Sequence, residues 1–182
     1  MSYSSIFTFS LIIFSIFFGI MAVYTLFYIN KQNIRKNEKI PRNIILGVIF
    51  ATIDIAWCIP QALSIFSPNS FNWIFPTAII CLVISCLFLD YLFARAFAGF
   101  LILLSHYFLL ESFAAGIPCM VIFSTACYIM GTFGIVVGGI PHLLRDLIRK
   151  ISNEKVWRIV FTAIFACYCV LGLIVSFSLI IK

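Results

Sequence analysis

The residues with the strongest potential for chemistry are a few polar side chains inside otherwise apolar stretches. Within residues 44–66, Asp54 and Gln61 recur at helical spacing on one face, together with Gly47 and Cys58. Asp54 lies near the middle of that stretch, where an acid costs about 2.5–3.5 kcal/mol on membrane-insertion scales. We therefore expect Asp54 to face the interior of a helix bundle.

Pro60 gives the same stretch a second unusual feature. It cannot donate a hydrogen bond to the carbonyl of Ala56, which leaves a free acceptor two residues beyond Asp54 and favours a kink. A kink beside an acid is typical of an ion or polar-ligand site. A hydrogen-bonded acid that joins two helices would leave the same pattern, and both interpretations remain open.

Arg95 and His106 are two further polar candidates. They are eleven residues apart, close to three full helical turns, so they share a face of one helix. A proton relay is one interpretation, whereas a lone histidine in a bundle is more often a hydrogen-bonded structural residue. Asp54, Gln61, His106 and Arg95 are thus the candidates for a polar or ion site.

Motifs of the common catalytic and metal sites do not occur in the sequence. It contains no H-E-x-x-H, no G-x-S-x-G and no P-loop. Its seven cysteines all fall inside apolar stretches without a C-x-x-C pair, as expected for small apolar fillers. We therefore predict no catalytic residues, no metal and no cofactor.

Long apolar runs must position these residues. The 182-residue chain is 64% hydrophobic and only 10% charged, which is typical of a polytopic membrane protein. We predict an all-α integral membrane protein, a single transmembrane domain over residues 1–182 with six transmembrane helices. The expected spans are about 5–29, 44–66, 72–90, 96–113, 118–140 and 159–181, with a short interfacial helix over 141–151.

The apolar run over residues 73–113 decides the number of spans. As one helix its 41 residues would be roughly 60 Å long, about twice the thickness of the bilayer core. We expect it to fold as a hairpin at residues 90–95, although residues 77–98 contain neither Gly nor Pro to break a helix. One overlong helix, which gives five spans, is the alternative.

Basic residues set the expected orientation. With six spans, residues 30–43, 90–95 and 141–158 share one side and hold eleven of the twelve basic residues, whereas five spans remove this bias. We predict that this side is cytoplasmic and that both termini are outside, in the cell inner membrane for a bacterial source. The residues predicted to set topology and contact lipid headgroups are Lys31, Arg35, Lys36, Lys39, Arg42, Arg145, Arg149 and Lys150.

The expected partners follow from the same pattern. Leu143, Leu144, Leu147 and Ile148 lie on one side of the 141–151 segment and its charges on another, which predicts an amphipathic helix on anionic headgroups. No aromatic residue interleaves the basic residues of the 30–43 segment, so nucleic acid is not expected.

Three classes of function remain, and we rank them by how well the sequence supports each. A non-enzymatic accessory or scaffold subunit of a membrane complex comes first, because small-residue stripes for helix packing recur in several spans while charge inside the spans is scarce. Its partner would be another membrane protein or a second copy. A small transporter or channel for protons, ions or a small solute, using Asp54, is the alternative. A membrane-embedded enzyme acting on lipid is third.

Overall fold

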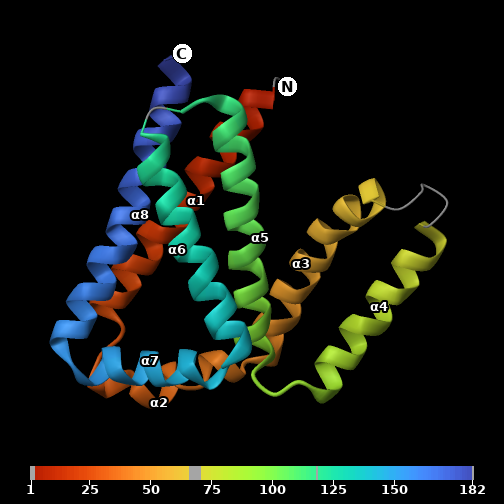
Figure 1. Cartoon of the computed structure of the whole chain (residues 1–182). Helices are drawn as coiled ribbons and strands as arrows, with labels where there is room; N and C mark the ends of the chain where they lie inside the picture. Colours follow the sequence, from red (N-terminus) through yellow and green to blue (C-terminus); the bar gives the residue numbers. More distant parts are fainter. Residues whose placement is uncertain (1–2, 66–70, 118, 182) are drawn as a thin grey trace. The chain divides into compact units, whose positions relative to one another are not determined.

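The structure is a computed structural model that describes residues 3–65, 71–117 and 119–181, and all secondary structure within them is helical (Figure 1). The longer helices are α1 (Tyr3–Phe27), α3 (Ile44–Ile65), α4 (Phe71–Phe88), α5 (Leu92–Ala115), α6 (Met120–Gly139), α7 (His142–Asn153) and α8 (Lys155–Ile181). Three short elements, η1 (Lys31–Asn33), α2 (Ile34–Asn37) and η2 (Ile40–Arg42), make up most of the basic segment that follows α1.

Four helices are long and apolar enough to cross a membrane. Their apolar parts are Ile6–Phe27, Leu92–Ala115, Met120–Gly139 and Lys155–Ile181, and two shorter apolar helices cover Ile44–Pro60 and Trp73–Leu87. Large apolar side chains are exposed on all six, as expected where lipid rather than water is the solvent. The four candidate spans indicate an integral, multi-pass membrane protein and confirm the all-helical fold, whereas the number of six transmembrane helices stays a prediction.

The chain breaks between α4 and α5, so the alternative of one overlong helix is wrong. The break is shorter than predicted, because α4 ends at Phe88 and α5 already begins at Leu92. Arg95 therefore lies in the first turn of α5 and not in the connection. Tyr91 adopts the left-handed conformation, with φ +59°, and so reverses the chain without Gly or Pro.

The described residues form two compact units, and α5, α6 and α7 contribute to both. The first unit contains α1 and α8, which lie side by side (Figure 1). A Cβ atom at Gly172 of α8 would overlap the Oγ of Ser15 on α1, and one at Gly19 would lie 3.4 Å from the Sγ of Cys169. Small residues of α1 and α8 thus pack against each other at Gly19 and Gly172.

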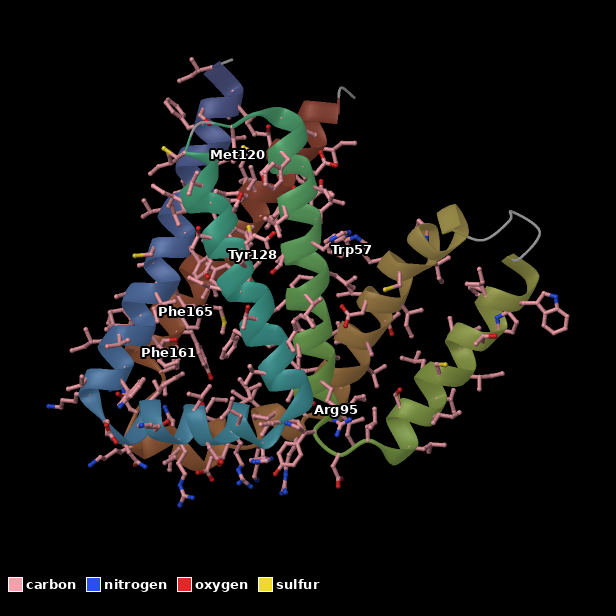
Figure 2. The ribbon with its side chains drawn as sticks, viewed as in Figure 1. Trp57, Arg95, Met120, Tyr128, Phe161 and Phe165 are labelled. Carbon is pink, nitrogen blue, oxygen red and sulfur yellow. The ribbon has the colours of Figure 1, made fainter. Side chains whose placement is uncertain are left out.

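The second unit contains α3, α4 and the first half of α5. A Cβ at Gly47 would meet the backbone of Phe93 at 2.8 Å, and one at Gly99 would lie 3.0 Å from the Oδ2 of Asp54. An advance of seven residues along α3, from Gly47 to Asp54, therefore matches six along α5, from Phe93 to Gly99, which means that the two helices run parallel. Trp57 lies on the side of α3 that faces α5, with its ring 6.3 Å from that of Phe100 (Figure 2).

The glycines of α6 serve the same purpose in this unit. A Cβ at Gly134 would lie 2.9 Å from the carbonyl oxygen of Ala98, and Val137 is fully buried with Ala94 and Ala98. Small residues on α5 and α6 therefore bring the two backbones close together.

Candidate functional site

Three groups of polar residues stand out, and the first is centred on Tyr91. Its Oη accepts hydrogen bonds from the Nη2 of Arg42 at 3.0 Å and from the Nη1 of Arg145 at 3.1 Å. The guanidinium carbon of Arg42 also lies 4.9 Å from the centre of the Tyr91 ring. The left-handed backbone of Tyr91 places its ring where the basic segment before α3 and the start of α7 both reach it.

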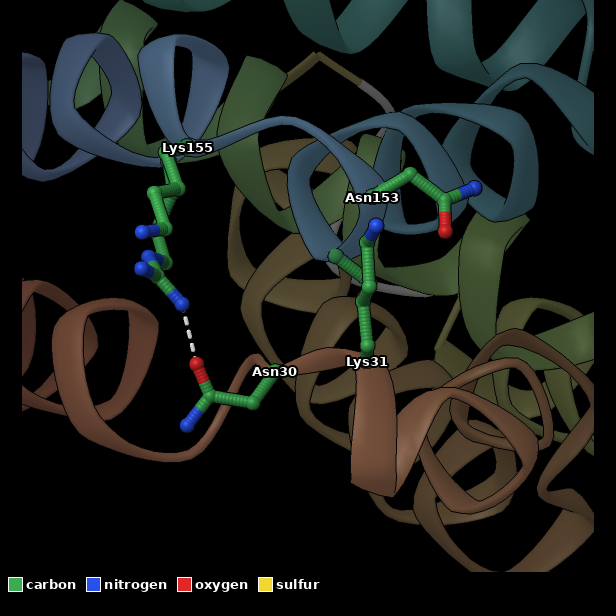
Figure 3. A pocket seen from close by; sticks show the side chains of 6 residues that line it. Asn30, Lys31, Asn153 and Lys155 are labelled. Carbon is green, nitrogen blue, oxygen red and sulfur yellow. Dashed lines mark hydrogen bonds between the residues drawn. The ribbon is translucent and has the colours of Figure 1, made fainter.

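The second group is a pocket of about 340 Å³ in the first unit (Figure 3). It is lined by the segment after α1, the end of α7 and the start of α8. The lining residues are Asn30, Lys31, Ser152, Asn153, Lys155 and Arg158. Three of them are cations and none is an acid, so the pocket favours an anion.

The hydrogen bonds that hold Arg158 in place both involve one atom of its guanidinium group, Nη1. Its Nη1 donates to the Oδ1 of Asn30 and to the backbone oxygen of Ile29. Its Nε is buried and has no hydrogen-bond acceptor among the described residues. A buried donor without an acceptor is costly, and Nε is such a donor within the described part of the chain.

The third group is Asp54 on α3. The side chain is half-buried and points at Gly99, and its Oδ1 is buried without a hydrogen-bond partner in the part of the chain that the structure describes. Gly99 leaves room for the carboxyl group because any larger residue would bring a Cβ within 3.0 Å of Oδ2.

Among the described residues, no hydrogen bond or ion pair joins Asp54 to Arg95 or His106. Gln61 lies on α3, but its side chain is outside the described residues. Arg95 and His106 are both on α5 and both exposed (Figure 2 for Arg95). The ionisable group that the described side chains place near Asp54 is the thiol of Cys58, one turn further along α3.

The basic residues that the sequence predicts to contact lipid headgroups do not share one environment. Lys31 lines the pocket, and Arg42 and Arg145 hold Tyr91. Lys150 lies 4.3 Å from the centre of the Trp157 ring, across the turn between α7 and α8. Lys36, Lys39 and Arg149 are exposed, and the side chain of Arg35 is not among those described.

Sequence reasoning missed Tyr91, Asn30 and Arg158 as centres of polar contacts. Arg158 stands out in the sequence only as a basic anchor of the last span. Its partner Asn30 is 128 residues away, so local spacing gives no signal of the pair. The one available signal was that both residues flank apolar runs on the same predicted side of the membrane.

No protein-family model, curated protein or solved structure matches this chain. Within the described ranges, no group of three or more His, Cys, Asp or Glu side chains is placed to hold a metal ion.

Proposed function

We propose that this membrane protein is a non-enzymatic accessory or scaffold subunit that assembles with a partner membrane protein or a second copy. The supporting observation is a set of small side chains that remain exposed. Ala163 and Cys167 are exposed one turn apart on α8, and Thr52 and Ala56 form a similar pair on α3. In a bilayer, small residues allow a second helix to approach closely and gain backbone contacts that lipid does not offer.

The test is co-purification after mild detergent extraction, with native mass spectrometry as the readout. Ala163→Phe should lower the amount of co-purified stoichiometric partner, or of homo-oligomer, at least tenfold. The bulky ring keeps the second helix away. Leu173→Phe is the control, since Leu173 is already large and exposed on the same helix. A chain that remains monomeric, or an assembly that both variants leave intact, would contradict the proposal.

The same proposal includes six membrane spans, with α3 and α4 added to the four long helices. Both termini are outside, and residues 30–43, 90–95 and 141–158 face the cytoplasm and its anionic lipid headgroups. The basic residues of these segments support this orientation through the positive-inside rule. The exposed Arg149 and Lys150 on α7 support contact between this helix and headgroups.

A transporter or channel is the second candidate, and the unpartnered Oδ1 of Asp54 favours it. A buried carboxylate oxygen without a donor is a potential ligand for a proton or a cation. In liposomes carrying a pH-sensitive dye, Asp54→Asn should abolish proton flux and leave the melting temperature unchanged. Asp90→Asn, at an exposed acid in the turn after α4, should leave the flux intact. Equal flux in all three proteins would exclude Asp54 as a carrier of protons.

A further inference from the structure

The basic pocket combines three features that together specify a ligand. Lys31, Lys155 and Arg158 bring positive charge from two different elements, and Asn30 and Asn153 add amide groups. Figure 3 shows side chains of α7, α8 and the segment after α1 lining one space. Because none of the described lining residues is acidic, a neutral or cationic ligand would leave the charges unbalanced.

The start of α8 strengthens the preference for an anion. Lys155 is the first residue of this 27-residue helix, so the positive end of its dipole lies beside the pocket, next to the C-terminal end of α7 at Asn153. Glu154 precedes α8, but it is exposed and is not among the described lining residues. Helix N-termini with adjacent cations are favourable binding sites for phosphate.

Arg158 is less exposed than the two lysines that line the pocket. Asn30 and Ile29 anchor its Nη1, which fixes the plane of the group. Its buried Nε remains without an acceptor among the described residues. Arg158 itself lines the pocket, and arginine is well suited to contacts with phosphate because its donors form a rigid fork.

We propose that this pocket binds a phosphate group, with Lys31, Lys155 and Arg158 as the ligating cations. The volume of about 340 Å³ is at the lower end of the range for small-molecule sites, which fits a phosphorylated headgroup or free phosphate rather than a whole lipid. Phosphate binding follows from the pocket alone. The further statement that the phosphate belongs to a lipid rests on the membrane orientation given under the proposed function.

The experiment uses the full chain purified in an uncharged detergent and two probes. The first probe is inorganic phosphate, titrated at constant ionic strength with sodium chloride as the compensating salt. The second is phosphatidic acid in mixed micelles, with phosphatidylcholine as the neutral reference. Calorimetry or the shift in melting temperature gives the dissociation constant of each probe.

Lys31→Gln is the main variant, because Lys31 is exposed and its replacement should leave the fold intact. It should weaken binding about tenfold, the loss expected for one charge-assisted hydrogen bond. Lys36→Gln is the matched control, since it removes the same charge from the same basic segment outside the pocket. Arg158→Lys keeps the charge but removes Nε, and should also weaken binding if the protein folds.

The two probes distinguish a lipid headgroup from free phosphate as the ligand of the pocket. Saturable binding of phosphatidic acid that only the pocket variants weaken supports the proposal with a lipid headgroup as ligand. Binding of inorganic phosphate alone supports the pocket but contradicts the lipid contact in the proposed function. Absence of saturable binding for both probes, or equal weakening by Lys36→Gln and Lys31→Gln, would overturn the proposal.

Discussion

A Cβ atom placed on Gly47 would lie only 2.8 Å from the backbone nitrogen of Phe93, so α3 and α5 approach each other to backbone contact at this point. The Cγ of Leu92 would be 2.9 Å away from the same Cβ. A real Cβ cannot fit without a shift of the α5 backbone. Gly47 therefore controls how close the two helices come.

Gly47→Ala should destabilise the protein by about 1–3 kcal/mol, the usual cost of overpacking a tight contact. Gly139→Ala is the control, because a Cβ there meets nothing within 4 Å and alanine has the higher helix propensity. Thermal unfolding in detergent measures both changes. If the two variants melt alike, the close contact between α3 and α5 is not present in solution.

Tyr91→Phe should destabilise the second unit by about 1 kcal/mol, because two guanidinium groups lose their shared acceptor while the ring remains. Tyr28→Phe, at an exposed tyrosine after α1, should cost less. Hydrogen exchange of amides near the start of α5 gives a second readout, since local opening should increase there only in the Tyr91 variant. Unchanged exchange would show that the hydroxyl does not anchor this turn.

The contact of Asp54 with Gly99 predicts coupling between the two positions. Gly99→Ala should lower stability by about 1 kcal/mol, because its Cβ would press on Oδ2. In an Asp54→Ala background the same change should become neutral or favourable, since the obstacle is gone and alanine favours the helix. Additive effects in this double-mutant cycle would mean that Asp54 does not face α5.

The proposed orientation predicts which side of the membrane each basic segment faces. In a cysteine-free background, single cysteines at positions 36 and 150 should react only with a reagent that reaches the cytoplasm. A cysteine in the turn at position 90 should behave in the same way. Labelling of position 150 from the outside, with position 36 protected, would contradict six spans.

Much of the fold follows from local properties of the sequence. Apolar runs of about 20 residues cannot stay exposed to water and must satisfy their backbone groups internally, so they form helices wherever they occur. The limit on helix length required a break in residues 73–113, and the structure has one. The face of α3 that carries Gly47 and Asp54 could also be read from helical periodicity, and both residues indeed face α5.

Only the tertiary structure decided which partner covers each face. The small residues of α1 and α8 are equally suited to an internal contact and to a partner protein, and the structure places Gly19 and Gly172 in an internal contact. Tyr91 joins Arg42 and Arg145 from 49 and 54 residues away, and Arg158 reaches Asn30 across 128. Periodicity assigns a residue to a face of its own helix, but the choice of a distant neighbour depends on how all helices pack together.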